Sequence, residues 1–146
     1  MTVTFFGHRD TPSAVYSILL KTITELIEEQ NADFFYVGNE GNFDRMVRRI
    51  LKMLSKEYPN MRYSVELAYL PWKKGKYNSE EDYNEASAFL ELEKVPKRFA
   101  IDRRNRIMID CADTVVTYVK HSYGGAAKFK DIAKKKGKMI IELANM

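Results

Sequence analysis

Hydrophobic positions along the chain alternate between two periods. Short runs of β-branched and aromatic residues are typical of buried strands, and they predict five strands at about residues 2–6, 34–37, 62–70, 114–119 and 138–143. Between these runs, apolar residues recur at helical spacing and predict helices at about 11–30, 42–58, 98–111 and 125–136. The stripe of the second helix, for example, consists of Phe43, Met46, Val47, Ile50, Leu51 and Leu54. Regular alternation of strands and helices indicates an α/β fold.

This order of elements restricts the topology. Hydrophobic strands that alternate with helices call for a parallel sheet with helices on both faces and right-handed crossovers. We therefore predict a three-layer α/β domain whose parallel five-stranded sheet has the order 3-2-1-4-5. A chain of 146 residues predicts one domain, 1–146, with a long excursion at about 71–97 where the pattern weakens. A short helix from Glu80 to Leu90 is one interpretation of that excursion.

Glycine-bearing turns follow three of the predicted strands. They are Gly7-His8-Arg9, Gly38-Asn39-Glu40-Gly41 and Ser122-Tyr123-Gly124-Gly125. In an open parallel sheet, ligands bind where strands end and helices begin, because glycine lets the backbone approach closely and helix N-termini offer N–H groups to anions. The predicted strand order brings the first and third of these turns to face each other across one crevice.

Two of the turns carry chemistry suited to an anion. Arg9 can hold a phosphate or carboxylate through two hydrogen bonds, and His8 can donate a hydrogen bond or move a proton. Gly124 and Gly125 open a helix directly after a central strand, which suits a phosphate. The alternative for His8 and Arg9 is an exposed pair that merely closes the strand.

The remaining candidates lie at helix starts and on the third helix. Gly38 and Gly41 have the spacing of a tight strand-to-helix turn. Asp44 falls in the first helical turn, where the helix dipole favours a carboxylate with or without a ligand. In Arg103-Arg104-Asn105-Arg106, each residue is rotated by about 100° from the last, so at least one arginine should point toward the crevice or a partner subunit. A basic solvent face with one inward salt bridge is the alternative.

Composition does not indicate a function, but it narrows the expected partners, location and cofactors. The net charge is +4, and two basic segments at 73–76 and 128–138 predict a solvated face, with nucleic-acid binding as the alternative. No run approaches the roughly 20 apolar residues of a membrane span, and the first residues do not resemble a signal peptide, so we expect a cytoplasmic location and no membrane partner. Cys111 lies in an apolar run and is expected to be buried; we predict no metal site and no cofactor.

Four segments in register resemble the SLOG superfamily, and within it a small bacterial branch whose members begin with a glycine-histidine-arginine turn. The segments are Phe5-Phe6-Gly7-His8-Arg9, Gly38-x-x-Gly41-x-x-Asp44, Arg104 to Asp110, and Gly124-Gly125. The resemblance implies a Rossmann-like fold. The superfamily includes the LOG-type phosphoribohydrolases, which cleave nucleoside monophosphates at the N-glycosidic bond, and the DNA-processing protein Smf/DprA, which binds single-stranded DNA.

The resemblance implies a nucleotide or nucleotide-derived ligand. The phosphate would bind at the first and last turns, at Gly7, His8, Arg9, Gly124 and Gly125. Arg104 and Asn105 would reach into the site from the third helix. The second turn would form the floor of the site with Gly38, Gly41 and Asp44.

One departure separates this chain from the phosphoribohydrolases. Their paired glycines lead into a threonine and then a glutamate that contacts the sugar, whereas Gly124-Gly125 is followed here by Ala126-Ala127-Lys128-Phe129. A hydrolase would need its carboxylate from Glu40, Asp44 or Asp110. Ligand binding is therefore our leading hypothesis, with N-glycosidic hydrolysis and association with DNA as alternatives. Pairing of two copies through the helix at 103–110 stays open.

Overall fold

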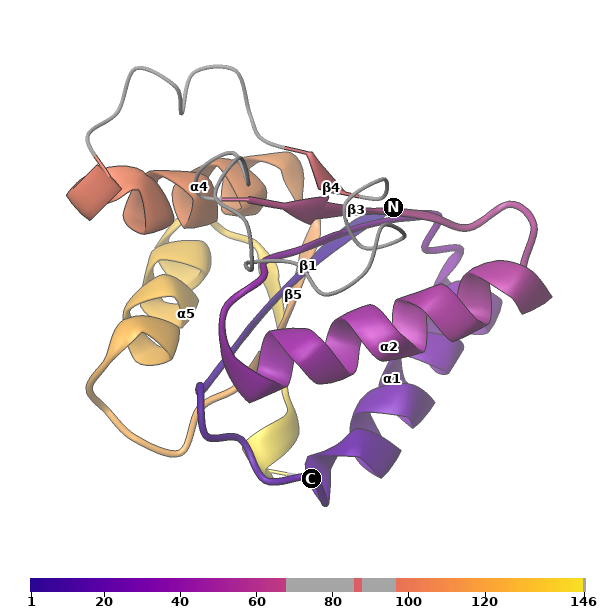
Figure 1. Cartoon of the computed structure of the whole chain (residues 1–146), viewed down its shortest axis with the longest axis horizontal. Coiled ribbons are helices and arrows are strands. Elements are labelled where there is room, and N and C mark those ends of the chain that lie inside the picture. The colour runs from indigo at the N-terminus through magenta and orange to yellow at the C-terminus, as the bar shows by residue number, and fades with distance from the viewer. Residues whose placement is uncertain (68–85, 88–96, 146) are drawn as a thin grey trace, which may run out of the picture.

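A parallel sheet runs through the middle of the computed structural model, which describes residues 1–67, 86–87 and 97–145 (Figure 1). Its strands lie in the order β4-β3-β2-β1-β5-β6, and every neighbouring pair is parallel. The strands are β1 (Thr2–Gly7), β2 (Phe34–Val37), β3 (Arg62–Glu66), β4 (Ala86–Ser87), β5 (Thr114–Tyr118) and β6 (Met139–Glu142). The five predicted strands correspond to β3-β2-β1-β5-β6, so the predicted order 3-2-1-4-5 is confirmed.

The sixth strand, β4, was not predicted. It pairs with the outer edge of β3 through Val65 with Ala86 and Glu66 with Ser87. A helix from Glu80 to Leu90 is therefore wrong at these two residues, and its other residues lie outside the described part of the chain. Pairing with a strand distant in sequence satisfies the backbone groups at the edge of β3, a gain that no local pattern reveals. The prediction of one domain for 1–146 stays a prediction.

Helices cover both faces of the sheet. Helices α1 (Val15–Gln30) and α2 (Gly41–Glu57) lie on one face, and α4 (Lys97–Cys111) and α5 (Gly125–Lys135) lie on the other (Figure 1). A single turn of 3-10 helix, Leu143–Asn145, follows β6. This arrangement gives the three layers that the sequence predicts.

Side chains of β1 point alternately to the two faces of the sheet and contribute to a hydrophobic core on each face. Val3 and Phe5 join the larger core beneath α1 and α2, whereas Phe6 joins a smaller core with Met108 and Phe129 beneath α4 and α5. The residues of the predicted α2 stripe are all buried. Burial of this one face explains why so polar a helix forms here, because tertiary packing rather than propensity stabilises most helices.

Two sequence expectations are corrected at helix ends. Helix α1 begins at Val15 rather than near Thr11, because the Thr11 hydroxyl and backbone N–H both donate to the His8 carbonyl, at 2.6 and 3.2 Å, in a turn that precedes the helix. Cys111 is exposed, so the expectation of a buried thiol is wrong. Its neighbours Met108 and Ile109 occupy the buried side of α4, and the last residue of the helix is rotated away from them.

Candidate functional site

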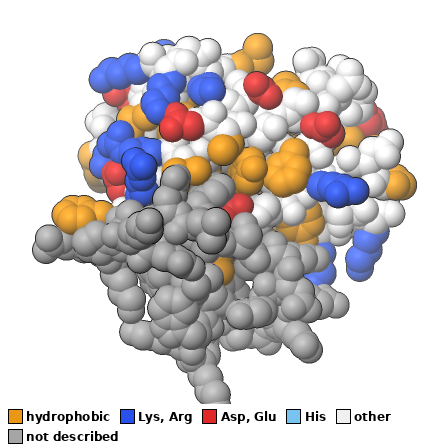
Figure 2. All heavy atoms as spheres, turned by 90° about the horizontal axis from the view of Figure 1, so that it is seen from above, with side chains coloured by type: hydrophobic (Ala, Val, Ile, Leu, Met, Phe, Trp, Pro, Cys, Tyr) orange, Lys and Arg blue, Asp and Glu red, His pale blue; other side chains and the backbone are white. Residues whose placement is uncertain are grey.

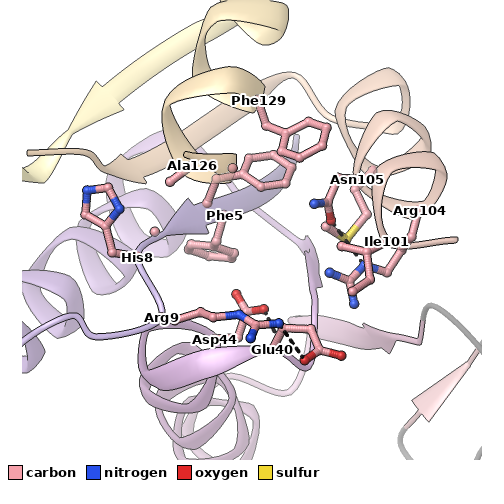
Figure 3. A pocket seen from close by; sticks show the side chains of 14 residues that line it. Phe5, His8, Arg9, Glu40, Asp44, Ile101, Arg104, Asn105, Ala126 and Phe129 are labelled. Atoms are coloured by element: carbon pink, nitrogen blue, oxygen red, sulfur yellow. Dashed lines mark hydrogen bonds and ion pairs between the residues drawn. The ribbon is translucent and has the colours of Figure 1, made fainter. Parts of the chain in front are cut away.

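A cavity of about 210 Å³ lies at the carboxyl end of β1, where α2, α4 and α5 come together (Figure 3). Its apolar lining comes from Phe5, Phe6, Ile101, Met108, Ala126 and Phe129. Of the ten predicted site residues, seven line it: Gly7, His8, Arg9, Asp44, Arg104, Asn105 and Gly125. Glu40 also lines it. The cavity brings residues from the turns after β1 and β2 and from α4 next to Gly125, whereas Ser122, Tyr123 and Gly124 of the third turn line a neighbouring hollow.

The glycines of the first two turns allow neighbouring side chains and backbone to pack against them closely. A Cβ atom added to Gly7 would overlap the ring of Phe43, and one added to Gly38 would lie 2.8 Å from Asp44 Oδ2. Gly41 has a φ of +88°, and a Cβ there would lie 2.7 Å from Arg9 Cα. Gly38 and Gly41 themselves are not among the residues that line the cavity. They let the polar side chains that do line it come close together.

The two glycines of the third turn differ from each other. Gly124 has a φ of +92°, which favours glycine, and it faces a neighbouring hollow with Tyr123 and Lys128. Gly125 is the first residue of α5 and lines the cavity. A Cβ atom at either position would meet no described atom within 4 Å. The space in front of the α5 N-terminus is therefore open to a ligand.

Asp44 is a buried carboxyl group at the start of α2. It is 8% exposed, and its Oδ2 accepts a hydrogen bond of 3.0 Å from the backbone N–H of Glu40. Burial raises the pKa of Asp44 to about 6, against the opposing effects of the Arg104 charge, the hydrogen bond from Glu40 and the Arg48 charge. A carboxyl group with this pKa can hold or release a proton near neutral pH.

Arg104 is the arginine that points inward from α4. It is 2% exposed, its Nη1 donates to Asn39 Oδ1 at 2.8 Å and to the Glu66 carbonyl at 3.4 Å, and its Nε donates to Asn105 Oδ1 at 3.1 Å. It thereby joins α4 to the ends of β2 and β3. Arg103 is exposed, and Arg106 pairs with Asp102 at 2.7 Å. The expectation that at least one of the three points inward is confirmed.

Arg9 lies at the mouth of the cavity. Its side chain is 74% exposed, and its guanidinium lies 3.5 Å from the Glu40 carboxylate, as Figure 3 shows. An exposed ion pair of this kind contributes about 0–1 kcal/mol. A multiply charged anion can therefore draw Arg9 away from Glu40 at little cost.

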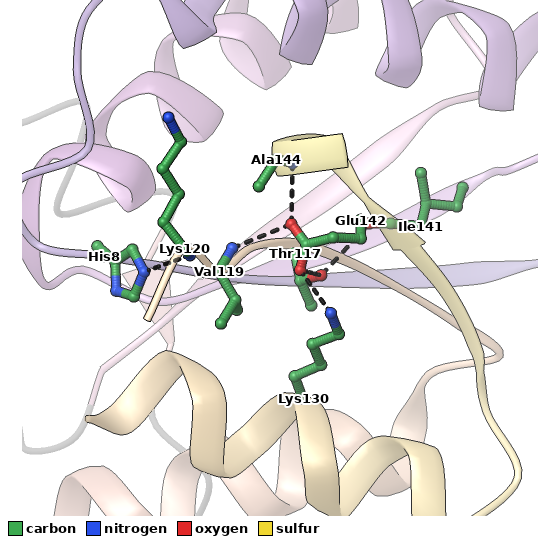
Figure 4. Close-up of polar contacts among 8 residues, drawn as sticks. All are labelled: His8, Thr117, Val119, Lys120, Lys130, Ile141, Glu142 and Ala144. Carbon is green, nitrogen blue, oxygen red and sulfur yellow. Dashed lines mark hydrogen bonds and ion pairs between the residues drawn. The ribbon is translucent and has the colours of Figure 1, made fainter. Parts of the chain in front are cut away.

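His8 joins the turns after β1 and β5. Its Nε2 accepts a hydrogen bond of 2.9 Å from the backbone N–H of Lys120 (Figure 4). The ring packs against His121 at 4.7 Å and edge-on against Tyr118 at 6.2 Å. Burial, followed by the effect of His121, lowers the pKa of His8 below its ordinary value of 6.5, which favours the neutral imidazole. With Nε2 accepting, the proton resides on Nδ1.

Glu142 at the end of β6 has a positioning role that the sequence did not reveal. Its carboxylate accepts hydrogen bonds from the backbone N–H groups of Val119 and Ala144, both 3.0 Å, from the Thr117 hydroxyl and from Lys130 (Figure 4). Burial would raise the pKa of Glu142, but these bonds outweigh it and lower the pKa. The network fixes the chain that leads from β5 toward Gly124 and Gly125. Because Lys130, Val119 and Thr117 are 12 to 25 positions away, no local pattern marks Glu142.

The basic segment on α5 is largely neutralised within the protein. Four of its lysines form ion pairs: Lys128 with Asp102, Lys130 with Glu142, Lys135 with Asp131 and Lys136 with Asp110. On the face shown in Figure 2, basic and acidic side chains are likewise interspersed among the described residues. The other basic segment, 73–76, lies outside the described residues. The solvated-face interpretation therefore fits α5.

Comparison with known proteins supports the fold. No protein-family model matches the sequence, and no curated protein is similar to it in sequence. Among solved structures, the chain is similar to the X-ray structure of DNA processing protein A (DprA) from Streptococcus pneumoniae, with a TM-score of 0.70 and 14% identity over 97% of this chain. The fold is Rossmann-like. The chain spans about half, 49%, of the length of DprA, and at this identity the likeness concerns the fold alone.

The described residues contain neither a candidate metal-binding cluster nor a candidate membrane-spanning helix. Within residues 1–67, 86–87 and 97–145, no group of three or more histidine, cysteine, aspartate or glutamate side chains is arranged to hold a metal ion. Over the same residues, none of the helices has the length and apolar character needed to cross a bilayer. The pairing of two copies through α4, and the cytoplasmic location, stay predictions.

Proposed function

We propose that this chain binds a nucleotide or a nucleotide-derived ligand in the cavity at the carboxyl end of β1. One observation carries the proposal: an exposed guanidinium, the open N-terminus of a helix and two buried polar side chains line the same cavity. These groups are Arg9, Gly125, Asp44 and Asn105. An anionic group would bind at Arg9 and the α5 N-terminus, and an uncharged polar group would bind deeper, at Asp44 and Asn105.

The fold supports this location. In open α/β sheets, ligands bind outside the carboxyl ends of the strands, where the strand order reverses, and here that point lies between β1 and β5. The likeness to DprA agrees with the SLOG-type fold that the four sequence motifs resemble. Membership of the branch with the glycine-histidine-arginine turn is part of the proposal, because it rests on the Gly7-His8-Arg9 motif alone.

Arg9→Ala tests the proposal. In calorimetry with a panel of nucleoside mono-, di- and triphosphates, we expect the variant to bind its best ligand about 10- to 100-fold more weakly than the wild type, since charge-assisted hydrogen bonds contribute about 1.5–3 kcal/mol. Arg106→Ala is the matched control, because Arg106 also pairs with a carboxylate but does not line the cavity. Equal losses in both variants, or no binding of any nucleotide by the wild type, would contradict the proposal.

N-glycosidic hydrolysis of nucleoside monophosphates is a second candidate, favoured by the carboxyl groups of the cavity. Glu40 and Asp44 both line it, and the pKa of Asp44 near 6 suits proton transfer. Asp110 is a weaker candidate, because it is exposed, pairs with Lys136 and does not line the cavity. Hydrolysis predicts release of free base and ribose phosphate, detected by chromatography, and its loss in Asp44→Asn. Absence of free base from all common monophosphates would exclude this candidate.

Association with DNA is the third candidate, and it rests on the likeness to a protein named for DNA processing. The likeness covers about half of DprA, so what the whole of that protein does need not reside in this part. In the present chain, Lys128 and Lys130 on α5 are paired with carboxylates, which argues against this candidate.

A further inference from the structure

Asn105 presents an unused hydrogen-bond donor to the cavity. The residue is 7% exposed, and its Oδ1 accepts a hydrogen bond from Arg104 Nε at 3.1 Å. A guanidinium only donates hydrogen bonds, so the amide must turn its oxygen toward Arg104 and its nitrogen away. Among the described residues, none accepts a hydrogen bond from that nitrogen. Two N–H donors of a nine-tenths buried side chain therefore remain for a ligand.

Asp44 presents an unused acceptor to the same cavity. Its Oδ2 accepts from the Glu40 backbone, whereas Oδ1 receives no hydrogen bond from the described residues. Asp44 comes from α2 and Asn105 from α4, and both line the cavity (Figure 3). When a ligand displaces water from the cavity, each of these two groups needs a new partner, so a ligand that pairs with both binds more tightly than one that leaves either unpaired.

The size and the walls of the cavity limit what can be enclosed. Its volume of about 210 Å³ is below the roughly 300–1,000 Å³ of pockets that hold drug-sized ligands. The described aromatic rings in its lining offer little open face to a base. Phe5 stacks on Phe35 with centroids 6.1 Å apart, Phe6 stacks on Phe129 at 5.5 Å, and each of these four rings is at most 6% exposed. A group enclosed here is therefore small rather than flat and aromatic.

We propose that Asp44 and Asn105 bind the vicinal hydroxyl groups of a pentose, and that the site therefore selects ribonucleotides over 2′-deoxyribonucleotides. A hydroxyl group both donates and accepts, so one hydroxyl donates to Asp44 Oδ1 while its neighbour accepts from the Asn105 amide. This inference rests on the proposed function, in which Arg9 and the α5 N-terminus hold the phosphate. A ligand without the second hydroxyl leaves one of the two buried groups unpaired.

Matched pairs of probes test the inference by calorimetry. The probes are the common ribonucleoside 5′-monophosphates with their 2′-deoxy forms, and ribose 5-phosphate with 2-deoxyribose 5-phosphate. We expect the wild type to prefer the ribo member by about 10-fold or more, as one lost hydrogen bond to a buried group implies. In Asp44→Ala and Asn105→Ala, the preference should fall to about twofold or less, because neither shortened side chain can pair with a hydroxyl.

Each variant removes every polar atom of the side chain that it changes. An exchange of Asp44 for Asn or of Asn105 for Asp would be a weaker test, because a hydroxyl also accepts from an amide and donates to a carboxylate. Asp113→Ala is the control, because Asp113 likewise accepts a backbone hydrogen bond, from Thr2, but is exposed and lies outside the cavity, and its ribo preference should equal that of the wild type. The two variants lie on different helices, so misfolding of one leaves the other informative.

The outcomes separate this inference from the proposed function. Equal affinity of the wild type for ribo and deoxyribo probes overturns the sugar inference and leaves nucleotide binding standing. A preference for ribose 5-phosphate without binding of any nucleotide supports the sugar inference and overturns the proposed function. A preference that persists in both variants overturns the assignment to Asp44 and Asn105. No binding of any probe overturns both proposals.

Discussion

At the scale of single residues, burial gives Asp44 an unusual pKa. The carboxyl group has few hydrogen bonds to compensate for lost water, and its pKa rises from 3.8 to about 6 despite the nearby Arg104 charge. Because the folded-state pKa lies above the unfolded value, the folded protein binds more protons than the unfolded chain between these two pH values. The Asp44 carboxyl therefore reduces stability progressively as the pH rises through this window.

Asp44→Asn should remove this pH dependence. Because a shift of about 2 pKa units corresponds to about 3 kcal/mol, we expect the free energy of unfolding of the variant, relative to wild type, to rise by up to about 3 kcal/mol from about pH 4 to about pH 7.5. Urea unfolding at both pH values measures it. His8 titrates in both proteins and cancels in the difference. A stability difference that does not change with pH would contradict the burial argument.

At the scale of elements, three strand-to-helix turns build the cavity, and they are held by contacts between turns. The N–H of Asn42, at the start of α2, donates to the carbonyl of Arg9 at 2.9 Å, and the N–H of Lys120, after β5, donates to His8. Glu142 fixes the segment after β5 from the neighbouring strand. The positions of the site residues therefore depend on how the turns dock, rather than on any one turn.

Gly41→Ala should mainly reduce stability, whereas Gly125→Ala should mainly weaken ligand binding. At Gly41, the positive φ and the 2.7 Å approach to Arg9 Cα predict a loss of about 2 kcal/mol or more in the free energy of unfolding. Gly125 has open surroundings, so its variant should stay within about 0.5 kcal/mol of wild type but bind nucleotide more weakly, since the methyl group occupies the approach to the helix N–H groups. Chemical unfolding and calorimetry measure the two effects. Loss of stability in Gly125→Ala equal to that in Gly41→Ala would refute this division.

At the scale of the whole molecule, charge pairing argues against an extended nucleic-acid surface on α5. Its lysines at 128, 130, 135 and 136 already neutralise carboxylates, so binding to a phosphate backbone would have to break these pairs. A net charge of +4 spread over 146 residues is also modest for such a surface.

The salt dependence of the affinity for single-stranded DNA tests this argument. Neutralising each phosphate of single-stranded DNA contributes a slope of about −0.7 to the plot of log K against log salt concentration, so we expect a slope no steeper than about −2. Fluorescence anisotropy with a labelled single-stranded oligonucleotide between about 50 and 200 mM salt gives the slope. A slope of about −4 or steeper, with tight binding, would favour the DNA-associated alternative over a small-molecule site.

Patterns in the sequence predict the order of five of the strands, the helices that cover them and half of the residues that line the cavity. The buried face of each strand or helix produces a periodic pattern of hydrophobic residues, and this pattern can be recognised within the element itself. Even the inward turn of one arginine on α4 follows from helical rotation, and Arg104 is that residue. The topological rule then placed Gly7, His8 and Arg9 beside Gly125.

Packing between distant parts of the chain establishes which polar atoms are paired within the protein and which remain for a ligand. The pairing of β4 with β3, the exposure of Cys111 and the network around Glu142 depend on partners distant in the chain. Gly38 and Gly41, which the sequence placed on the floor, proved to lie behind it, against Asp44 and Arg9. The Asn105 amide is oriented by Arg104, and Asp44 acquires its pKa from burial. Hydrogen-bond partners and desolvation are properties of the packed molecule, so no local pattern in the sequence contains them.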